Sequence, residues 1–185
     1  MIEDTLLDAE DRMEKTLSST QIELGKVRTG RANPAMLDAV KVDYYGAKTP
    51  LKQVANIGVP EPRMILIQPW DKSVLSEIEK AIQMADLGIT PNNDGHVIRL
   101  PIPPLTEETR KDLVKVVHSL GEEGKIAIRN IRRDAIDQLR KAQKDHKISE
   151  DEEYNAGIDI QELTDKYTEK IDEVIKAKET EIMEV

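Results

Sequence analysis

Apolar residues recur at alternating steps of three and four in three long stretches of this 185-residue chain. Such spacing lines up one apolar stripe along an α-helix. It predicts helices over residues 3–28, from about 106 to 147, and from 150 to about 182. Each stripe is narrow, and a long helix cannot bury its stripe alone. The sequence therefore predicts that the three helices pack together as an elongated bundle.

Residues that begin and end helices occur at the borders of these stretches. Thr106 can cap the second helix, and the Ser-Glu-Asp-Glu run at 149–152 fits a capping box for the third. Gly30 can adopt the left-handed backbone conformation found at helix ends, and Pro34 hinders resumption of the first helix. The helix borders are therefore predicted from local chemistry as well as from periodicity.

The segment between the first two helices has a different composition. Eight of the nine prolines fall between residues 50 and 104, and the ninth is Pro34. Short β-branched runs predict strands near residues 40–44, 64–67 and 97–102, and helical spacing predicts a helix over 71–87. About 70 residues suffice for a small compact domain. These residues are therefore expected to form a separate β/α/β domain.

The order of these segments predicts an α+β fold. Residues 1–30 and 105–185 are expected to form a discontinuous three-helix bundle, and residues 31–104 the inserted domain. The chain would cross between them near Gly30-Arg31 and near Pro103-Pro104-Leu105. Glycine at one crossing and proline at the other suit a hinge, although composition alone fits a simple domain boundary equally well.

Composition excludes several functional classes. Without cysteine, the chain has neither disulfides nor cysteine-ligated metal, and its three histidines are far apart and outside known metal motifs. The run at 121–126 weakly resembles a phosphate loop but has the wrong spacing and lies within a helical pattern. No apolar run approaches the roughly 18 residues of a membrane span, and the first eleven residues are acidic, unlike a targeting peptide. A non-enzymatic protein that stays in the compartment where it is made is expected.

The net charge of −9 is unevenly distributed. Residues 105–147 carry 11 basic and 8 acidic side chains, whereas residues 148–185 carry 4 and 13. On a helical wheel, the basic residues of the second helix gather opposite its apolar stripe. They are densest at Arg129, Arg132 and Arg133. Glu122 is the only acidic residue near the centre of this stripe, which suggests few intrahelical ion pairs.

A basic helix face has two interpretations. Most such faces are simply solvated, whereas closely spaced arginines can also hold phosphate groups through their planar guanidinium groups. One Trp, four Tyr and no Phe provide no aromatic platform for stacking a single strand of bases. Folded RNA contacted through its backbone fits the sequence better.

Two glycines lie within the second predicted helix. Gly124 falls on the apolar stripe, where the missing side chain permits close contact with another helix. For Gly121 the sequence predicts only a lower helix propensity, which costs about 1 kcal/mol of helix stability relative to alanine.

Seven short motifs follow one another along the chain. They are KVRTGRA at 26–32, YYG at 44–46, TPL at 49–51, ADLG at 85–88, IRLP at 98–101, PPLTEE at 103–108 and RNIRRD at 129–134. With these motifs the chain resembles the ribosome recycling factor family over essentially its whole length. The resemblance implies an L-shaped protein whose bundle and inserted domain are joined by a flexible two-strand hinge. The hinge residues would be Gly30, Arg31, Pro103, Pro104 and Leu105.

The resemblance implies a translation factor without catalytic residues, metal or cofactor. Such a factor binds the post-termination ribosome and, with elongation factor G and GTP, promotes its dissociation into subunits. It is expected to act as a monomer in the cytoplasm, without contact with a membrane. Contacts with large-subunit rRNA are carried over from the family to Arg110, Arg129, Arg132, Arg133, Arg28 and Arg31.

One position departs from the family pattern, and one other functional class stays open. Ile136 stands where family members often have Asn, and it would either weaken an RNA contact or pack against the ribosome. A helical adaptor or chaperone that binds basic proteins through the acidic residues 148–185 is the alternative function.

Overall fold

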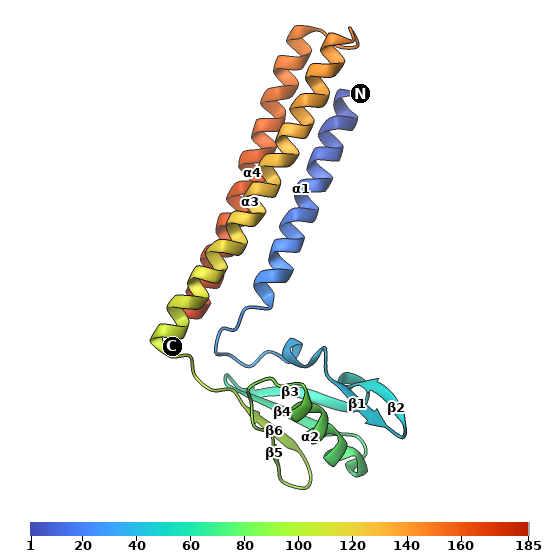
Figure 1. Cartoon of the computed structure of the whole chain (residues 1–185), viewed down its shortest axis with the longest axis vertical. Helices are drawn as coiled ribbons and strands as arrows, with labels where there is room; N and C mark the ends of the chain where they lie inside the picture. The colour runs from blue at the N-terminus through green and yellow to red at the C-terminus, as the bar shows by residue number, and fades with distance from the viewer. Residues whose placement is uncertain (185) are drawn as a thin grey trace. The chain divides into compact units, whose positions relative to one another are not determined.

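A computed structural model describes residues 1–184 of the chain (Figure 1). These residues form two compact units, one made of residues 1–27 with the residues from 107 onward, the other of residues 28–106. The first unit is helical and the second contains the strands. No helix within residues 1–184 is long and apolar enough to pass through a bilayer.

The helical unit contains α1 (Ile2–Gly25), α3 (Glu107–Lys144) and α4 (Glu150–Met183). Each of the three helices packs against both of the others, and Figure 1 shows them side by side. The predicted three-helix bundle is thus confirmed. The capping box at the start of α4 is also confirmed, because the Ser149 hydroxyl accepts from the Glu152 N–H and the Glu152 carboxylate accepts from the Ser149 N–H.

Buried residues of the bundle largely follow the predicted stripes. On α3 they are Val117, Gly121, Gly124, Ile128, Ile131, Ala135, Leu139 and Ala142. On α4, Thr164 and Ile175 are buried where the sequence pattern favoured Leu163 and Val174, both only half-buried. The predicted and the observed buried faces of α4 differ by one residue at these two positions. An average helical spacing does not resolve a difference this small.

The first helix ends earlier than predicted. Gly25 is its last residue, and the N–H groups of Lys26 and Val27 donate to the carbonyls of Glu23 and Leu24, respectively. The prediction that it extends to Arg28 is wrong, because glycine is a poor helix former and the final turn tightens there. Gly30 has a positive φ of 76° as expected, but it lies beyond the helix in the connecting segment.

The end of α3 is a Schellman motif. The Lys147 N–H donates to the Ala142 carbonyl at 2.9 Å and the His146 N–H to the Gln143 carbonyl at 3.0 Å. This geometry forces His146 into the left-handed region, at φ 55°, and ends the helix at Lys144 instead of near 147.

Replacing His146 with glycine is expected to stabilise the protein by about 1 kcal/mol, because glycine adopts this conformation without the steric cost that a side chain imposes. Urea unfolding followed by circular dichroism measures the change. His146→Ala is the control, since alanine keeps the Cβ atom. Equal stability of the two variants would contradict the explanation.

Tyr167 links α4 to α1 inside the bundle. It is buried, and its hydroxyl donates to the Glu14 carboxylate at 2.9 Å. Burial first, and then the hydrogen bond to Glu14, raise the pKa of the Tyr167 hydroxyl to about 12.

A raised pKa means that folding favours the neutral phenol. The contribution of Tyr167 to stability is complete below the ordinary tyrosine pKa of about 10 and is lost as pH rises toward 12. The urea midpoint of the wild type is therefore expected to fall more steeply between pH 9.5 and about 11.5 than that of Tyr167→Phe. Parallel pH profiles of the two proteins would rule out this role for the hydroxyl.

The second unit is built on two antiparallel sheets. A hairpin pairs β1 (Lys41–Tyr44) with β2 (Ala47–Pro50). The other sheet has the strand order β3-β4-β6-β5, formed by Ala55–Glu61, Met64–Pro69, Ile98–Pro101 and Asn92–Asn93. Helix α2 (Leu75–Met84) completes the unit, and short 3-10 turns occupy Pro34–Leu37, Leu51–Gln53 and Lys72–Val74.

One apolar core holds this unit together. Its fully buried side chains include Val42 of β1, Ile65 and Ile67 of β4, Ile78 of α2 and Ile98 of β6. The predicted strands and helix are present, but β2, β3 and β5 were not predicted. Helix α2 ends at Met84 instead of Leu87, because the backbone of Asp86 already has a positive φ of 49°.

Candidate nucleic-acid interface

Three arginines lie together in the middle of α3. Arg129, Arg132 and Arg133 are separated by three and four residues, which places them on neighbouring turns of one helix face. Arg129 and Arg133 are exposed and Arg132 is half-buried. The buried residues Ile128 and Ile131 anchor the same turns in the bundle. This arginine cluster therefore sits on a rigid backbone.

The three guanidinium groups differ in their partners. Arg129 pairs with the Glu122 carboxylate at 2.5 Å, and Arg132 donates to the amide oxygen of Gln161 on α4 at 3.4 Å. Arg133 makes no hydrogen bond or ion pair with any residue in 1–184. Glu122, the one acidic residue near the centre of this stripe, thus neutralises Arg129, because the two side chains reach each other across two helical turns. Arg132 and Arg133 keep most of their donors available.

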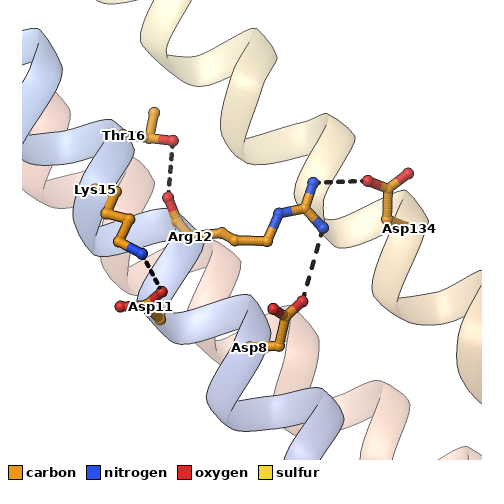
Figure 2. Close-up of polar contacts among 6 residues, drawn as sticks. All are labelled: Asp8, Asp11, Arg12, Lys15, Thr16 and Asp134. Atoms are coloured by element: carbon orange, nitrogen blue, oxygen red, sulfur yellow. Dashed lines mark hydrogen bonds and ion pairs between the residues drawn. The ribbon is translucent and has the colours of Figure 1, made fainter.

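The acidic residue beside the cluster is turned away toward α1. Figure 2 shows the Asp134 carboxylate accepting from Arg12, with Nη2 to Oδ2 at 2.8 Å, while the other Arg12 nitrogen lies 3.9 Å from Asp8. The Thr16 hydroxyl donates to the Arg12 carbonyl at 2.9 Å. Arg12 thus neutralises the carboxylate that follows Arg133 in the sequence.

Arg110 lies apart from this cluster. It is 19 residues before Arg129, which is about 28 Å along the helix axis at 1.5 Å per residue. Its guanidinium donates to the Met183 carbonyl at 3.4 Å, at the C-terminal end of α4, where a positive charge is favourable. The structure therefore gives Arg110 a role within the bundle.

Arg28 and Arg31 belong to the second unit, and both are exposed. Their part in an RNA-binding face stays a prediction. The same holds for the hinge, although the local geometry of its residues is defined. An ideal Cβ atom on Gly30 would lie 3.2 Å from Leu105 Cγ, so the two crossings touch at Gly30 and Leu105.

Both crossings are fastened to one turn of the second unit. The Ala32 N–H donates to the Pro62 carbonyl and the Ile102 N–H to the Arg63 carbonyl, each at 2.7 Å. These bonds fix the chain on the inserted side of both crossings. The segments 28–31 and 103–106 are left between this turn and the helices.

Sequence reasoning missed Arg12 and Gln161 as supports of the arginine cluster. Both belong to other helices, and no spacing within α3 indicates them. Ile136 is half-buried and lies beside Gly157 of α4. Its Cδ1 atom is 3.8 Å from the position that an ideal Cβ atom on Gly157 would occupy. Within residues 1–184 no three His, Asp or Glu side chains are grouped as a metal site.

The amino-acid sequence of this chain is similar to those of known proteins. The model of the ribosome recycling factor family matches residues 20–183. The ribosome-recycling factor of Halalkalibacterium halodurans is 58% identical over 185 residues, covering 100% of both chains.

Two solved structures are also similar. A solution structure of a ribosome recycling factor gives a TM-score of 0.78 at 42% identity, covering 100% of this chain and 98% of that one. The T. thermophilus ribosome recycling factor, from models with E. coli elongation factor G bound to the E. coli post-termination complex, gives 0.65 at 46% identity, covering 100% of both chains.

Proposed function

The chain belongs to the ribosome recycling factor family, and from this membership we propose that it binds the post-termination ribosome and, with elongation factor G and GTP, promotes dissociation into subunits. Members of this family are translation factors rather than enzymes, and so is this chain. The T. thermophilus relative, described together with elongation factor G as bound to a post-termination complex, supports the same partner here.

The observation that carries the proposal is the arginine cluster on α3. Arg133 has no partner within residues 1–184, and Arg132 has only one weak hydrogen bond, so both can bind the phosphates of large-subunit rRNA. The acidic residues of α4 would help to orient the protein, because the RNA repels them. Arg129 adds a third contact when Glu122 releases it, and Arg28, Arg31 and Arg110 remain further candidates.

Separation of binding and motion is the second part of the proposal. The bundle would hold the ribosome, and elongation factor G would push the second unit about the segments 28–31 and 103–106. Gly30, with its positive φ, and Leu105, which it touches, would form the pivot together with Arg31, Pro103 and Pro104. The driving free energy would come from GTP hydrolysis by the elongation factor. The protein would act as a monomer in the cytoplasm.

Sedimentation of model post-termination ribosomes in sucrose gradients tests the proposed function. The protein, elongation factor G and GTP are added singly and together. Conversion to free subunits only with all three supports recycling. Failure of the protein to co-sediment with ribosomes, together with no splitting, would instead favour an adaptor that uses the acidic face of α4.

Arg12 is expected to support rRNA binding without touching the RNA. Arg12→Gln leaves the Asp134 carboxylate unpaired beside the arginine cluster, so ribosome affinity should fall roughly two- to fivefold, as for an exposed ion pair of 0.2–1 kcal/mol. Adding Asp134→Asn should restore it, and high salt should reduce the effect. Filter-binding titrations measure the affinity.

Lys15→Gln is the matched control for this prediction. It removes one positive charge from the same helix, where Lys15 pairs with Asp11 at 2.7 Å. Equal losses in the two single variants would mean that net charge, and not the Asp134 pair, determines the affinity.

A further inference from the structure

A groove of about 560 Å³ runs between α3 and α4 near the loop that joins them. Its walls include Ile136 and Gln143 of α3, and Glu153, Tyr154 and Ile158 of α4. Tyr154 and Ile158 are 71% and 43% exposed, whereas Ile160 and Tyr167, farther along α4, are buried. The Tyr154 hydroxyl has no hydrogen-bond partner within residues 1–184. The groove therefore presents an open aromatic and aliphatic surface.

The groove continues the row of the arginine cluster. Arg129, Arg132, Ile136, Arg140 and Gln143 follow one another at steps of three and four, which places them along one side of α3. Arg132 donates to Gln161, and Gln161 both lines the groove and donates to Asp165 at 2.9 Å. The Arg132 guanidinium is thus held at the rim. A phosphate bound there would lie next to the apolar walls.

The charged side chains around the groove determine which chemical groups can bind in it. Glu150 and Glu153 line it without an ion pair to any residue in 1–184, so a phosphate inside would be repelled. Carboxylates and the Gln143 amide accept hydrogen bonds from amino and ring N–H groups. Arg132 disfavours a cationic side chain, and Arg140, which lies 3.8 Å from Asp137, does so more weakly. A flat apolar ring with N–H donors on its edge, attached to a phosphate, satisfies all of these features.

We propose that this groove receives one unstacked nucleobase of the rRNA, with an amino group on its edge, whose neighbouring phosphate is held by Arg132. The base would stack on Tyr154 between Ile136 and Ile158, and its edge would face Glu150, Glu153 and Gln143. This proposal rests on the proposed function, because the RNA is the ribosome's. One base stacked on Tyr154 is consistent with a chain that lacks an aromatic platform for a longer strand.

Binding to isolated large ribosomal subunits tests the groove, with wild type, Tyr154→Ala, Tyr154→Phe and Arg132→Ala. Tyr154→Ala should weaken binding about tenfold and leave the salt dependence unchanged, since stacking involves no counterion release. Tyr154→Phe should bind nearly as wild type. Arg132→Ala should lower the salt slope by about one. Leu7→Ala, at a side chain of α1 that is 59% exposed, controls for loss of exposed apolar surface.

Base-specific chemical modification of the rRNA identifies the occupant. Wild type and Tyr154→Phe should protect one nucleobase that Tyr154→Ala leaves reactive. Unchanged affinity and protection in Tyr154→Ala would overturn the proposal. Lost affinity without any change in base reactivity would overturn it as well, because a ribosomal protein would then occupy the groove. Failure of the wild type to bind the subunit would contradict the proposed function itself.

Discussion

Replacing both Arg132 and Arg133 with alanine is expected to weaken ribosome binding by about a hundredfold or more, because each hydrogen-bonded charge contact contributes about 1.5–3 kcal/mol net of its exchange with water. The slope of log affinity against log salt should fall by about two, one for each phosphate that the variant no longer binds. Subunit splitting at limiting protein should decline in parallel. Titrations at several salt concentrations measure both effects.

A matched double variant distinguishes loss of the arginine cluster from loss of positive charge anywhere on α3. Lys111→Ala with Lys115→Ala removes the same charge from the same helix, four to five turns before the cluster. It should bind with nearly the wild-type affinity. Equal weakening by the two double variants would show that the arginine cluster has no special place in binding.

Replacing Gly121 with valine is expected to destabilise the bundle by about 3 kcal/mol or more. A Cβ atom at this position would lie 1.9 Å from Cδ1 and 2.6 Å from Cγ1 of Ile175, a buried residue of α4. Overpacking of this kind typically costs about 1–3 kcal/mol, and valine adds two further methyl groups to the same space. Urea unfolding measures the change.

Two further variants make this result interpretable. Gly157→Ala is the control, since its Cβ would meet only Ile136 at an ordinary 3.8 Å, and it should stabilise α4 by up to about 1 kcal/mol. Gly121→Ala combined with Ile175→Ala should lose less stability than the two single losses added together, because the truncated side chain makes room for the new Cβ atom. A Gly121→Val protein as stable as the wild type would show that α4 shifts to make room.

Gly121 also shows where sequence reasoning stops. The close contact at Gly124, with Thr20 Oγ1 2.7 Å from an ideal Cβ, was expected because Gly124 lies on the apolar stripe. Gly121 was interpreted as merely unfavourable, and that interpretation is wrong. Its contact with Ile175 depends on how α3 and α4 are rotated against each other, which no pattern within one helix determines.

The strands that were not predicted have a similar explanation. β3 contains Gly58 and Pro60 and exposes most of its residues, so neither composition nor alternation indicates a strand. It lies at the edge of its sheet, where proline is tolerated. The inner strands β4 and β6 bury alternate apolar residues and were predicted.

The candidate site also has a part that the sequence predicts and a part that it does not. Arg129, Arg132 and Arg133 could be selected from their spacing on one helix, because periodicity is local. The contacts that distinguish them could not, since Gln161 and Arg12 come from helices distant in the sequence. Arg110 was grouped with them by resemblance, and its bond to the end of α4 became visible only in three dimensions.

Because the helical unit is discontinuous in the sequence, it can assemble only late in synthesis of the chain. During synthesis α1 emerges first, but both helices against which it packs lie beyond residue 106. Residues 28–106 have their own core and can fold while α1 still has no partner. The nascent chain thus carries the apolar stripe of α1 exposed until α3 and α4 arrive. We expect chaperones to engage α1 in this interval.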